Sequence, residues 1–443
     1  MRTALFPLSF RWLAALTGIL ALVCAVVSWW LIPTWANPEL RVVLPFLREQ
    51  LILPAVVLGV AAAILFNPHN KSCASFGPAT SLSAWQRCRP ALVTLWVSAV
   101  VGPLLGWSYP LIRGAMAGFR LVDLVPLLAL LAALLALASL AALFANLLPR
   151  IWTVVLTPVL CALVIVAPVA LDNLLLSDSG FSVFSLAFMR GFRLISFPTD
   201  AVLSVEVLRL LYFLLLAVCA TIATTHANMF SLTARRPSLL RAAAFLVPPV
   251  AVFAASAAVS PVLVGPYTGP TTCDVAGNHK VCLPSAQAHM LPGLTAHVAT
   301  FVEQLPPGWV PDDETVAFSP GNSTYFSLPD PSDVASQQEW EEIYFASLAQ
   351  GALPLHDPTN DACLSNSFTG DVANALLLRS GVPVAPVHAL NETTGESITI
   401  VPRADDSPAL AFLTGLSNEE FHGWLTANRE ALATCTLSEE AFE

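Results

Sequence analysis

Long apolar runs, separated by short polar stretches, dominate the first 265 residues of the chain. A helix needs about 20 predominantly apolar residues to cross the hydrocarbon core of a bilayer. The first run is too long for the core of a signal peptide, so we expect it to remain in the protein as a span. The pattern therefore predicts seven transmembrane helices, at about 12–32, 50–66, 91–111, 122–147, 151–171, 205–225 and 242–264.

After residue 265 the apolar runs become shorter and more broken. Ser417 and Glu420 form a capping box ahead of the last helical pattern, and Pro292 is expected to kink or split the first. Helices and short strands in mixed order indicate an α+β domain with one compact core. The predicted helices are 285–305, 332–351, 360–380 and 417–434, and the predicted strands are 314–318, 323–328, 383–389 and 397–401.

Composition supports a division into two domains. Charged residues make up 11% of the chain and hydrophobic residues 56%, whereas soluble domains carry about 25% charged residues. Residues 1–265 hold 16 of the 20 Lys and Arg but 7 of the 30 Asp and Glu, so residues 266–443 are strongly acidic. Phosphate binding needs clustered Lys and Arg, which argues against nucleic acid as a partner.

Basic residues in the loops predict which side of the membrane each loop faces. One set of loops carries basic residues and no acid: Arg2, Arg11, Lys71, Arg87, Arg89, Arg150, Arg235, Arg236 and Arg241. The opposite loops mix both signs, as in the predicted loop that contains Glu39, Arg41, Arg48 and Glu49. We expect the first set to be cytoplasmic, which places residues 266–443 outside the cell. Losing one span would invert this domain.

The sequence thus predicts a multi-pass plasma-membrane protein with a cytoplasmic N-terminus. Its fold class is an α-helical polytopic membrane domain of about 6+1 transmembrane helices, residues 1–265, followed by a small α+β extracytoplasmic domain, residues 266–443. We expect the lipid bilayer to be a partner of this protein.

Few charged residues fall within the predicted spans. Asp123, Glu206 and Arg209 lie near span ends, where a side chain reaches water easily, so we expect interfacial charges. Prolines within the spans either bend helices for transport or serve packing alone. These prolines are Pro54, Pro103, Pro158, Pro168, Pro248 and Pro249.

The stretch TTCDVAGNHKVC, residues 271–282, admits a metal site, a redox pair or a disulfide-closed hairpin. Four cysteines in the second domain, expected outside the cell, favour disulfides: Cys273, Cys282, Cys363 and Cys435. We expect Cys273–Cys282 around a Gly277-Asn278 turn and Cys363–Cys435 elsewhere, with His279 facing water. Zinc would need two further ligands, and a cytoplasmic location would leave the thiols reduced.

The six-span core resembles the membrane subunit of an ABC transporter of the exporter-permease type. In that family a cytoplasmic helix between the second and third spans couples to a separate ATPase, and subunits work as dimers. The matching segment here is SLSAWQRCRPAL, residues 81–92, although it has no acidic residue. Its candidate coupling residues are Trp85, Gln86, Arg87 and Arg89.

More narrowly, the chain resembles actinobacterial permease-like proteins with a seventh span and an extracytoplasmic domain. Their outer domain begins with a Cys…Val-Cys motif, which matches Cys273 and Val281-Cys282 here, and LPGL follows at 291–294. The resemblance covers about residues 1–305. It implies an export subunit that works with a separate ABC ATPase, as a homo- or heterodimer.

Several catalytic patterns are missing from the sequence. The two lysines, Lys71 and Lys280, do not follow glycine, so a G-x-x-x-x-G-K-[ST] phosphate loop is absent and an ATPase must be another polypeptide. H-E-x-x-H, G-x-S-x-G and S-x-x-K are also missing. We therefore expect no enzyme activity, no cofactor, and no catalytic or metal residues.

Two further hypotheses remain at the sequence level. The alternative function is a membrane-anchored extracytoplasmic binding or sensing protein without transport activity. A third hypothesis is an outer-face enzyme built on His356, Asp357 and Cys363, the one polar cluster that resembles a site.

Overall fold

The structure is a computed structural model of the 443-residue chain. It describes residues 10–31, 39–66, 84–148, 152–175, 199–201, 203–230, 243–252, 254, 264–266, 269–277, 279–307, 309, 345, 349, 353, 367–382, 387–390, 397–400 and 407–442.

The chain divides into two compact units. The helical unit comprises residues 1–33, 38–193 and 201–265, and the second unit comprises residues 34–37, 194–200 and 266–443. Within the described ranges the helical unit consists mainly of helices. The short strands β1 (Thr199–Ala201) and β2 (Val264–Pro266) pair with each other, and each crosses a boundary between the two units along the sequence.

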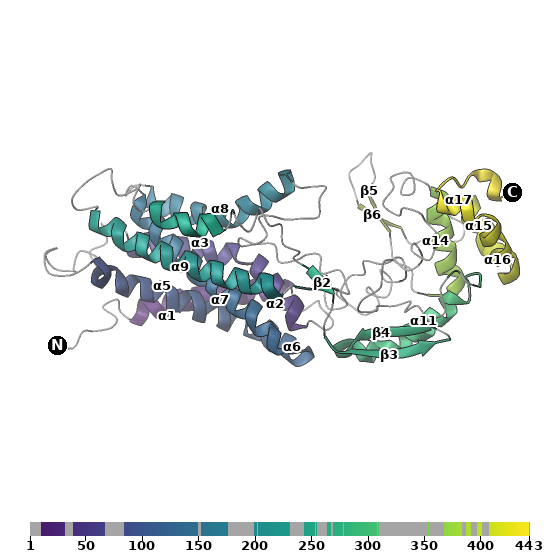
Figure 1. The fold of residues 1–443 in the computed structure, drawn as a ribbon, viewed down its shortest axis with the longest axis horizontal. Helices are drawn as coiled ribbons and strands as arrows, with labels where there is room; N and C mark the ends of the chain where they lie inside the picture. Colours follow the sequence, from purple (N-terminus) through teal and green to yellow (C-terminus); the bar gives the residue numbers. More distant parts are fainter. Residues whose placement is uncertain are drawn as a thin grey trace. The chain divides into compact units, whose positions relative to one another are not determined.

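The helices of the helical unit run alongside one another (Figure 1). They are α1 (Phe10–Leu31), α2 (Leu40–Glu49), α3 (Ile52–Phe66), α5 (Ala84–Gly106), α6 (Ser108–Ala117), η1 (Leu121–Asp123), α7 (Leu124–Leu147), α8 (Thr153–Leu175) and α9 (Leu203–Phe230), with a further helix at Ala243–Val252.

Five apolar stretches in the described chain are long enough to cross a membrane: Arg11–Trp29, Val43–Phe66, Cys88–Gly106, Leu121–Leu147 and Leu203–His226. They correspond to the first, second, third, fourth and sixth predicted spans. Shorter apolar helices, Thr153–Ala167 and Ala243–Val252, fall on the predicted fifth and seventh spans. The helical membrane domain is therefore confirmed as a class, whereas the count of seven spans stays a prediction.

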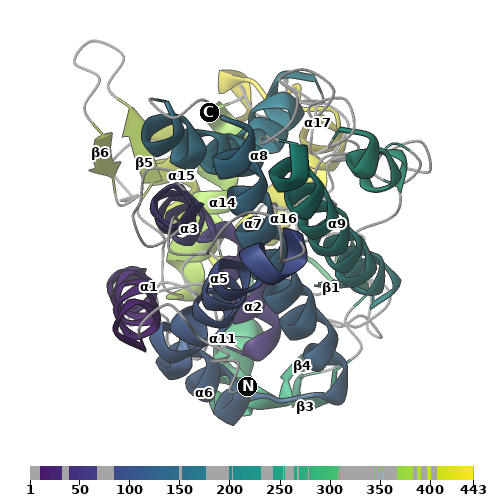
Figure 2. The same ribbon diagram turned by 90° about the vertical axis from the view of Figure 1, so that its left-hand side faces the viewer.

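Helix α7 forms the centre of the helical unit. It is apolar on all sides, and nearly every residue from Ala129 to Ala145 is buried. A helix that is hydrophobic all round must be surrounded by other helices. Accordingly, α7 packs against α9, α3, α5 and α8, while α1 lies at the edge of the unit in the end-on view of Figure 2.

Small residues let α1 and α5 pack closely. An added Cβ at Gly106 would lie 2.6 Å from the Cβ of Cys24, and one at Gly102 would lie 2.6 Å from the Cβ of Leu20. Two glycines four residues apart are a common close-packing motif between membrane helices. Thr17 Oγ1 also donates to Ser98 Oγ over 3.1 Å, which fixes how the two helices are aligned.

Two short helices, α2 and α6, are separated from the longer helices α3 and α5 by breaks of two residues and one residue. Helix α2 ends at Glu49 and α3 begins at Ile52, while α5 ends at Gly106 and α6 begins at Ser108. The short segments α2 and α6 pack against each other, with Gly114 of α6 close to the backbone of Leu40. Residues 39–49 were predicted as a loop, so that expectation is wrong: Leu40, Val43, Leu44 and Leu47 form a buried helical face.

The second unit begins with the hairpin of β3 (Thr271–Ala276) and β4 (His279–Pro284). Its helices are η3 (Ser285–Met290), α11 (Leu291–Val302), α14 (Ser367–Ser380), α15 (Pro408–Gly415), α16 (Asn418–Ala427), α17 (Arg429–Ala433) and η4 (Glu439–Phe442), and β5 (Val387–Leu390) pairs with β6 (Ser397–Ile400). The α+β class is confirmed at this coarse level.

Most predicted elements of the second unit can be compared with the structure. Pro292 does split the first helix, because η3 ends at Met290 and α11 starts at Leu291. The capping box of Ser417 and Glu420 is present. Helix α15 was not predicted. The predicted strands 314–318 and 323–328, and most of the predicted helix 332–351, lie outside the described residues.

Apolar side chains from the hairpin and the helices form one core in the second unit, including Val281, Leu294, Phe301, Leu376 and Phe421.

Arg379 of α14 contacts the end of α15 and the start of α16, so it links three helices of this unit. Its guanidinium donates to the carbonyls of Leu413 and Leu416 at the end of α15, over 3.1 and 2.6 Å. It also donates to Asn418 Oδ1 over 2.7 Å and lies 4.5 Å from the ring centre of Phe421. Arg379 therefore satisfies carbonyls that a helix end leaves without internal partners.

Candidate functional site: buried charges in the helical unit

Three charged side chains from distant parts of the chain meet inside the helical unit. The Arg48 guanidinium at the end of α2 donates two hydrogen bonds to the Glu206 carboxylate on α9, over 3.0 and 2.6 Å. Arg209, one turn further along α9, donates to the same carboxylate. Arg48 and Arg209 are 0% exposed and Glu206 is 2% exposed. We call this group the Arg–Glu–Arg cluster.

Local structure places each charge of the cluster where the backbone favours it. Arg48 lies in the last turn of α2 and Glu206 in the first turn of α9. A cation is stabilised near a helix C-terminus and an anion near an N-terminus. Residues three apart, such as Glu206 and Arg209, are neighbours on one helix surface. The two-pronged Arg48–Glu206 contact is the strong geometry for a guanidinium and a carboxylate.

A second buried ion pair stands at the other end of α2. The guanidinium of Arg41 donates through Nε to Glu39 Oε2 over 2.8 Å, and these residues are 5% and 4% exposed. An added Cβ on Gly118, just after α6, would lie 3.5 Å from the Glu39 side chain. Both ends of α2 are thus held by charged contacts within the protein.

Asp123 closes the turn that starts α7. Its carboxylate accepts from the backbone N–H of Arg120 over 2.9 Å and from the Arg120 guanidinium over 3.1 Å. Asp123 is 2% exposed. The Asp123 carboxylate therefore caps η1, the short turn before α7, and pairs with Arg120.

These findings correct the prediction for Asp123, Glu206 and Arg209. Their position near helix ends is confirmed, but they are buried in protein and paired, not facing water. Charges removed from solvent are costly unless they are paired and hydrogen-bonded. The sequence does not reveal the partner Arg48, because the charges of residues 39–49 are typical of a loop.

A hydroxyl network joins three helices at mid-length. Trp96 Nε1 of α5 donates to Ser139 Oγ of α7 over 3.0 Å, and Thr221 Oγ1 of α9 lies 3.3 Å from the same oxygen. Ser139 is fully buried. Polar side chains between membrane helices fix their packing, so this network defines the α5–α7–α9 core.

The predicted coupling segment is the start of α5, not a separate helix. Residues 84–106 form one continuous helix, so Trp85, Gln86, Arg87 and Arg89 occupy its first two turns. Trp85 is 42% exposed and Arg89 is also exposed. The backbone of Gln86 and Arg87 is described, but their side chains are not.

The prediction of a disulfide-closed hairpin is confirmed. Cys273 and Cys282 are directly paired across β3 and β4 and are joined by a disulfide. Gly277 at the turn has a φ of +62°, which glycine adopts without strain. The expectation that His279 faces water is wrong: it begins β4 and is 6% exposed, because it sits opposite the buried Ala276.

The second disulfide is described in part. Cys435 is disulfide-bonded, and the Cys363–Cys435 pairing stays a prediction because Cys363 lies outside the described residues. His356 and Asp357, from the outer-face enzyme hypothesis, also lie outside them. Within the described residues no group of three or more His, Cys, Asp or Glu could hold a metal ion.

Comparison with protein-family models, with curated proteins and with solved structures found no match to this chain.

Proposed function

We propose that this chain is a permease-like subunit of an ABC-type export system and works with a separate ATPase. The observation that supports this best is that short helices, α2 and α6, adjoin the longer helices α3 and α5 across breaks of one or two residues. The buried Arg48–Glu206 ion pair joins the short helix α2 to α9.

Interrupted helices suit transport because they separate rigid segments. Transporters use broken helices at their substrate sites, and charged residues buried at membrane depth are costly enough to suggest function. Here α2 and α6 pack on each other, and in our proposal they shift together relative to α3 and α5 during transport. The Arg–Glu–Arg cluster would hold this pair in one of its positions.

Energy for such a shift has to come from another polypeptide, since the chain lacks a phosphate loop. Helix α5 offers a mechanical route. It runs without interruption from Ala84 to Gly106, and the break before α6 follows directly. A force applied by an ATPase at Trp85 and Arg89 would therefore reach the α2–α6 pair along one continuous helix.

The proposed topology places the N-terminus in the cytoplasm and residues 266–443 outside. The prediction of seven spans and the nine basic residues in loops without acids support it. The Cys273–Cys282 disulfide supports it independently, because disulfides persist in oxidising compartments.

Co-purification tests the ATPase partnership. The native protein, crosslinked in its own membranes and extracted in mild detergent, should carry an ATP-hydrolysing protein with it. Trp85→Ala combined with Arg89→Glu should lose that partner, whereas Leu211→Ala, an exposed change on α9, should keep it. Recovery of the wild-type chain without an ATPase, and unchanged export on its deletion, would refute the proposal.

The alternative function is a membrane-anchored binding or sensing protein. Its support is that the second unit has a continuous hydrophobic core and a disulfide of its own. Under this hypothesis residues 266–443 fold alone and bind a defined ligand, and the helices act as an anchor. A ligand-dependent rise in the melting temperature of the isolated domain would favour it over export.

A further inference from the structure

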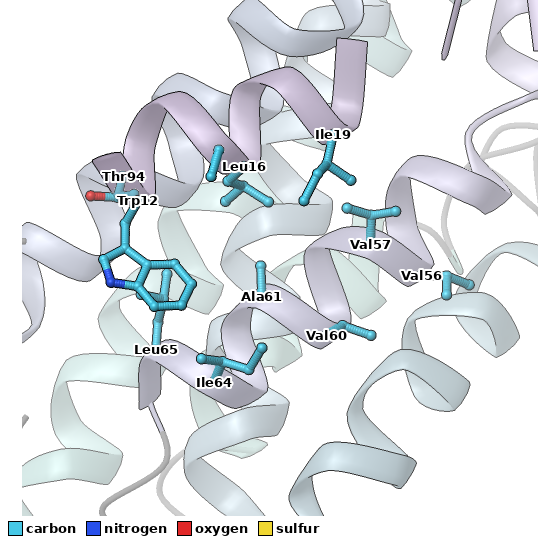
Figure 3. A pocket seen from close by; sticks show the side chains of 11 residues that line it. Trp12, Leu16, Ile19, Val56, Val57, Val60, Ala61, Ile64, Leu65 and Thr94 are labelled. Atoms are coloured by element: carbon cyan, nitrogen blue, oxygen red, sulfur yellow. The ribbon is translucent and has the colours of Figure 1, made fainter. Parts of the chain in front are cut away.

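An apolar groove runs between α1 and α3 on the side of the helical unit, with a volume of about 260 Å³ (Figure 3). Helix α1 contributes Trp12, Leu16 and Ile19, and α3 contributes Val57, Ala61 and Leu65 along the opposite wall. The lining side chains are apolar apart from the Thr94 hydroxyl and the Trp12 indole N–H.

The groove exists because α1 packs along α5 and leaves space beside α3. The close contacts of Gly102 and Gly106 with α1 hold it against α5. The side chains along the groove's edges are open, with Trp12 49%, Ile19 51% and Val60 37% exposed. Both walls belong to stretches of membrane-spanning length, so an occupant would enter sideways from the hydrocarbon of the bilayer.

The two ends of the groove differ chemically. Ile19 and Val57 lie at one end, whereas Trp12 lies at the other, beside Leu65 and Thr94 (Figure 3). Trp favours the membrane–water boundary because its ring is apolar and its N–H is polar. The Trp12 end is therefore the end nearer the membrane surface.

Two cations stand just beyond the Trp12 end. Arg11 precedes Trp12 on α1, and Arg89 lies five residues before Thr94 on α5, about 7 Å further along the helix axis. Thr17, Leu20 and Cys24 of α1 contact Ser98, Gly102 and Gly106 of α5 in that order, so the two helices run parallel and both arginines fall at the same end. Both are exposed. An apolar groove with two exposed arginines beyond its Trp12 end complements an anionic amphiphile.

We propose that this groove binds one acyl chain of an anionic phospholipid, whose phosphate lies against Arg11 and Arg89. Guanidinium groups match phosphate oxygens in geometry and charge. The distance from Trp12 to Ile19 along α1 is about 10 Å, which accommodates part of an acyl chain. This inference does not depend on an ATPase or on transport, and it goes beyond the proposed function.

Native mass spectrometry of the full-length protein in mild detergent tests the proposal. The protein is offered phosphatidylglycerol or phosphatidylcholine with the same acyl chains, and the bound fraction is measured at each lipid concentration. We expect phosphatidylglycerol to be retained preferentially. Arg11→Gln and Arg89→Gln should each weaken it about fivefold, as expected for one basic residue at an anionic membrane surface. Arg429→Gln, which removes an exposed charge in the second unit, should change nothing.

A second variant tests the groove itself. Ala61→Trp fills it from the α3 side and should abolish the bound lipid, whereas Leu211→Trp, on the exposed face of α9, should leave it. Elution volume and melting temperature check that each variant folds. If Ala61→Trp does not fold, the exposed arginine variants still decide the outcome.

Three results would overturn the proposal. The first is equal retention of the two lipids, or no loss in either arginine variant. The second is unchanged lipid binding in folded Ala61→Trp. The third is loss of a dimer in Ala61→Trp without loss of lipid, which would assign the groove to a second copy of this chain.

Discussion

At the scale of single residues, Glu206 is the side chain on which the Arg–Glu–Arg cluster of the helical unit depends. Its carboxylate accepts hydrogen bonds from Arg48 on α2 and from Arg209 on α9. The sequence showed Glu206 and Arg209 near a helix end. It could not show their burial, because burial depends on Arg48, 158 positions away in the chain.

Glu206→Gln should destabilise the helical unit by about 3 kcal/mol, because two buried guanidinium groups lose their counter-charge. Arg48→Lys should cost less, since lysine keeps the charge but loses the two-pronged contact. Unfolding of the purified protein in mixed detergent micelles measures both free energies. If Glu206→Gln is as stable as the wild type, the cluster does not hold α2 to α9.

Glu420 makes a pH-dependent contribution to the second unit. Hydrogen bonds from the backbone and side chain of Ser417 lower the pKa of this carboxyl below its ordinary value. A depressed carboxyl pKa means that the stabilisation is present above the unfolded-state pKa, near 4.3, and is lost as pH falls through the folded-state pKa.

Glu420→Gln should therefore lower the melting temperature of the second unit at pH 7, and the difference from the wild type should shrink below about pH 4. Glu419→Gln, one residue earlier and outside the capping box, is the matched control. Circular dichroism melts at several pH values check this. A difference that does not depend on pH would contradict the role of the carboxylate.

At the scale of elements, α2 illustrates what sequence reasoning can recover. The four charges within residues 39–49 suggest a loop, yet Leu40, Val43, Leu44 and Leu47 follow the spacing of one helix face, and all are buried. That spacing was visible in the sequence. The break between α2 and α3 was not, because it depends on packing against α6 and α7. The apolar spans themselves were predicted well, since length and hydropathy dominate there.

The contact between α1 and α5 leads to a prediction about packing. Gly106→Leu places a side chain where even a Cβ would clash with Cys24, so it should cost about 1–3 kcal/mol. Gly18→Leu is the matched control on α1, because nothing lies within 4 Å of an added Cβ there. Thermal unfolding in detergent compares the two variants. Equal effects would show that α1 and α5 are not closely packed.

The disulfide-closed hairpin leads to a prediction about folding of the second unit. Replacing Cys273 and Cys282 together with alanine should lower its free energy of unfolding by about 2–3 kcal/mol, because the unfolded loop gains freedom. Val275→Ala, at an exposed position on the same strand, should have little effect. Urea unfolding followed by circular dichroism measures the difference. An unchanged transition midpoint would mean that the disulfide contributes no stability.

At the scale of the whole molecule, charge asymmetry and hydropathy divide the chain near residue 265, and a boundary between the two compact units falls after Gly265 in the sequence. The orientation of the protein in the membrane follows from the number of spans and from the basic residues in the loops. The packing inside the helical unit determines neither of these. This orientation decides on which side of the membrane the disulfides lie and on which side the coupling segment lies.

Cysteine labelling in intact cells tests this topology most directly. A membrane-impermeant maleimide is applied to cells that carry Ala427→Cys, an exposed position at the end of α16, and the reaction is compared with native Cys73 in the predicted cytoplasmic loop. The buried thiols Cys24, Cys88, Cys161 and Cys219 give the background. The account predicts that Ala427→Cys reacts in intact cells and that Cys73 reacts only after permeabilisation. Labelling in the reverse order would contradict it.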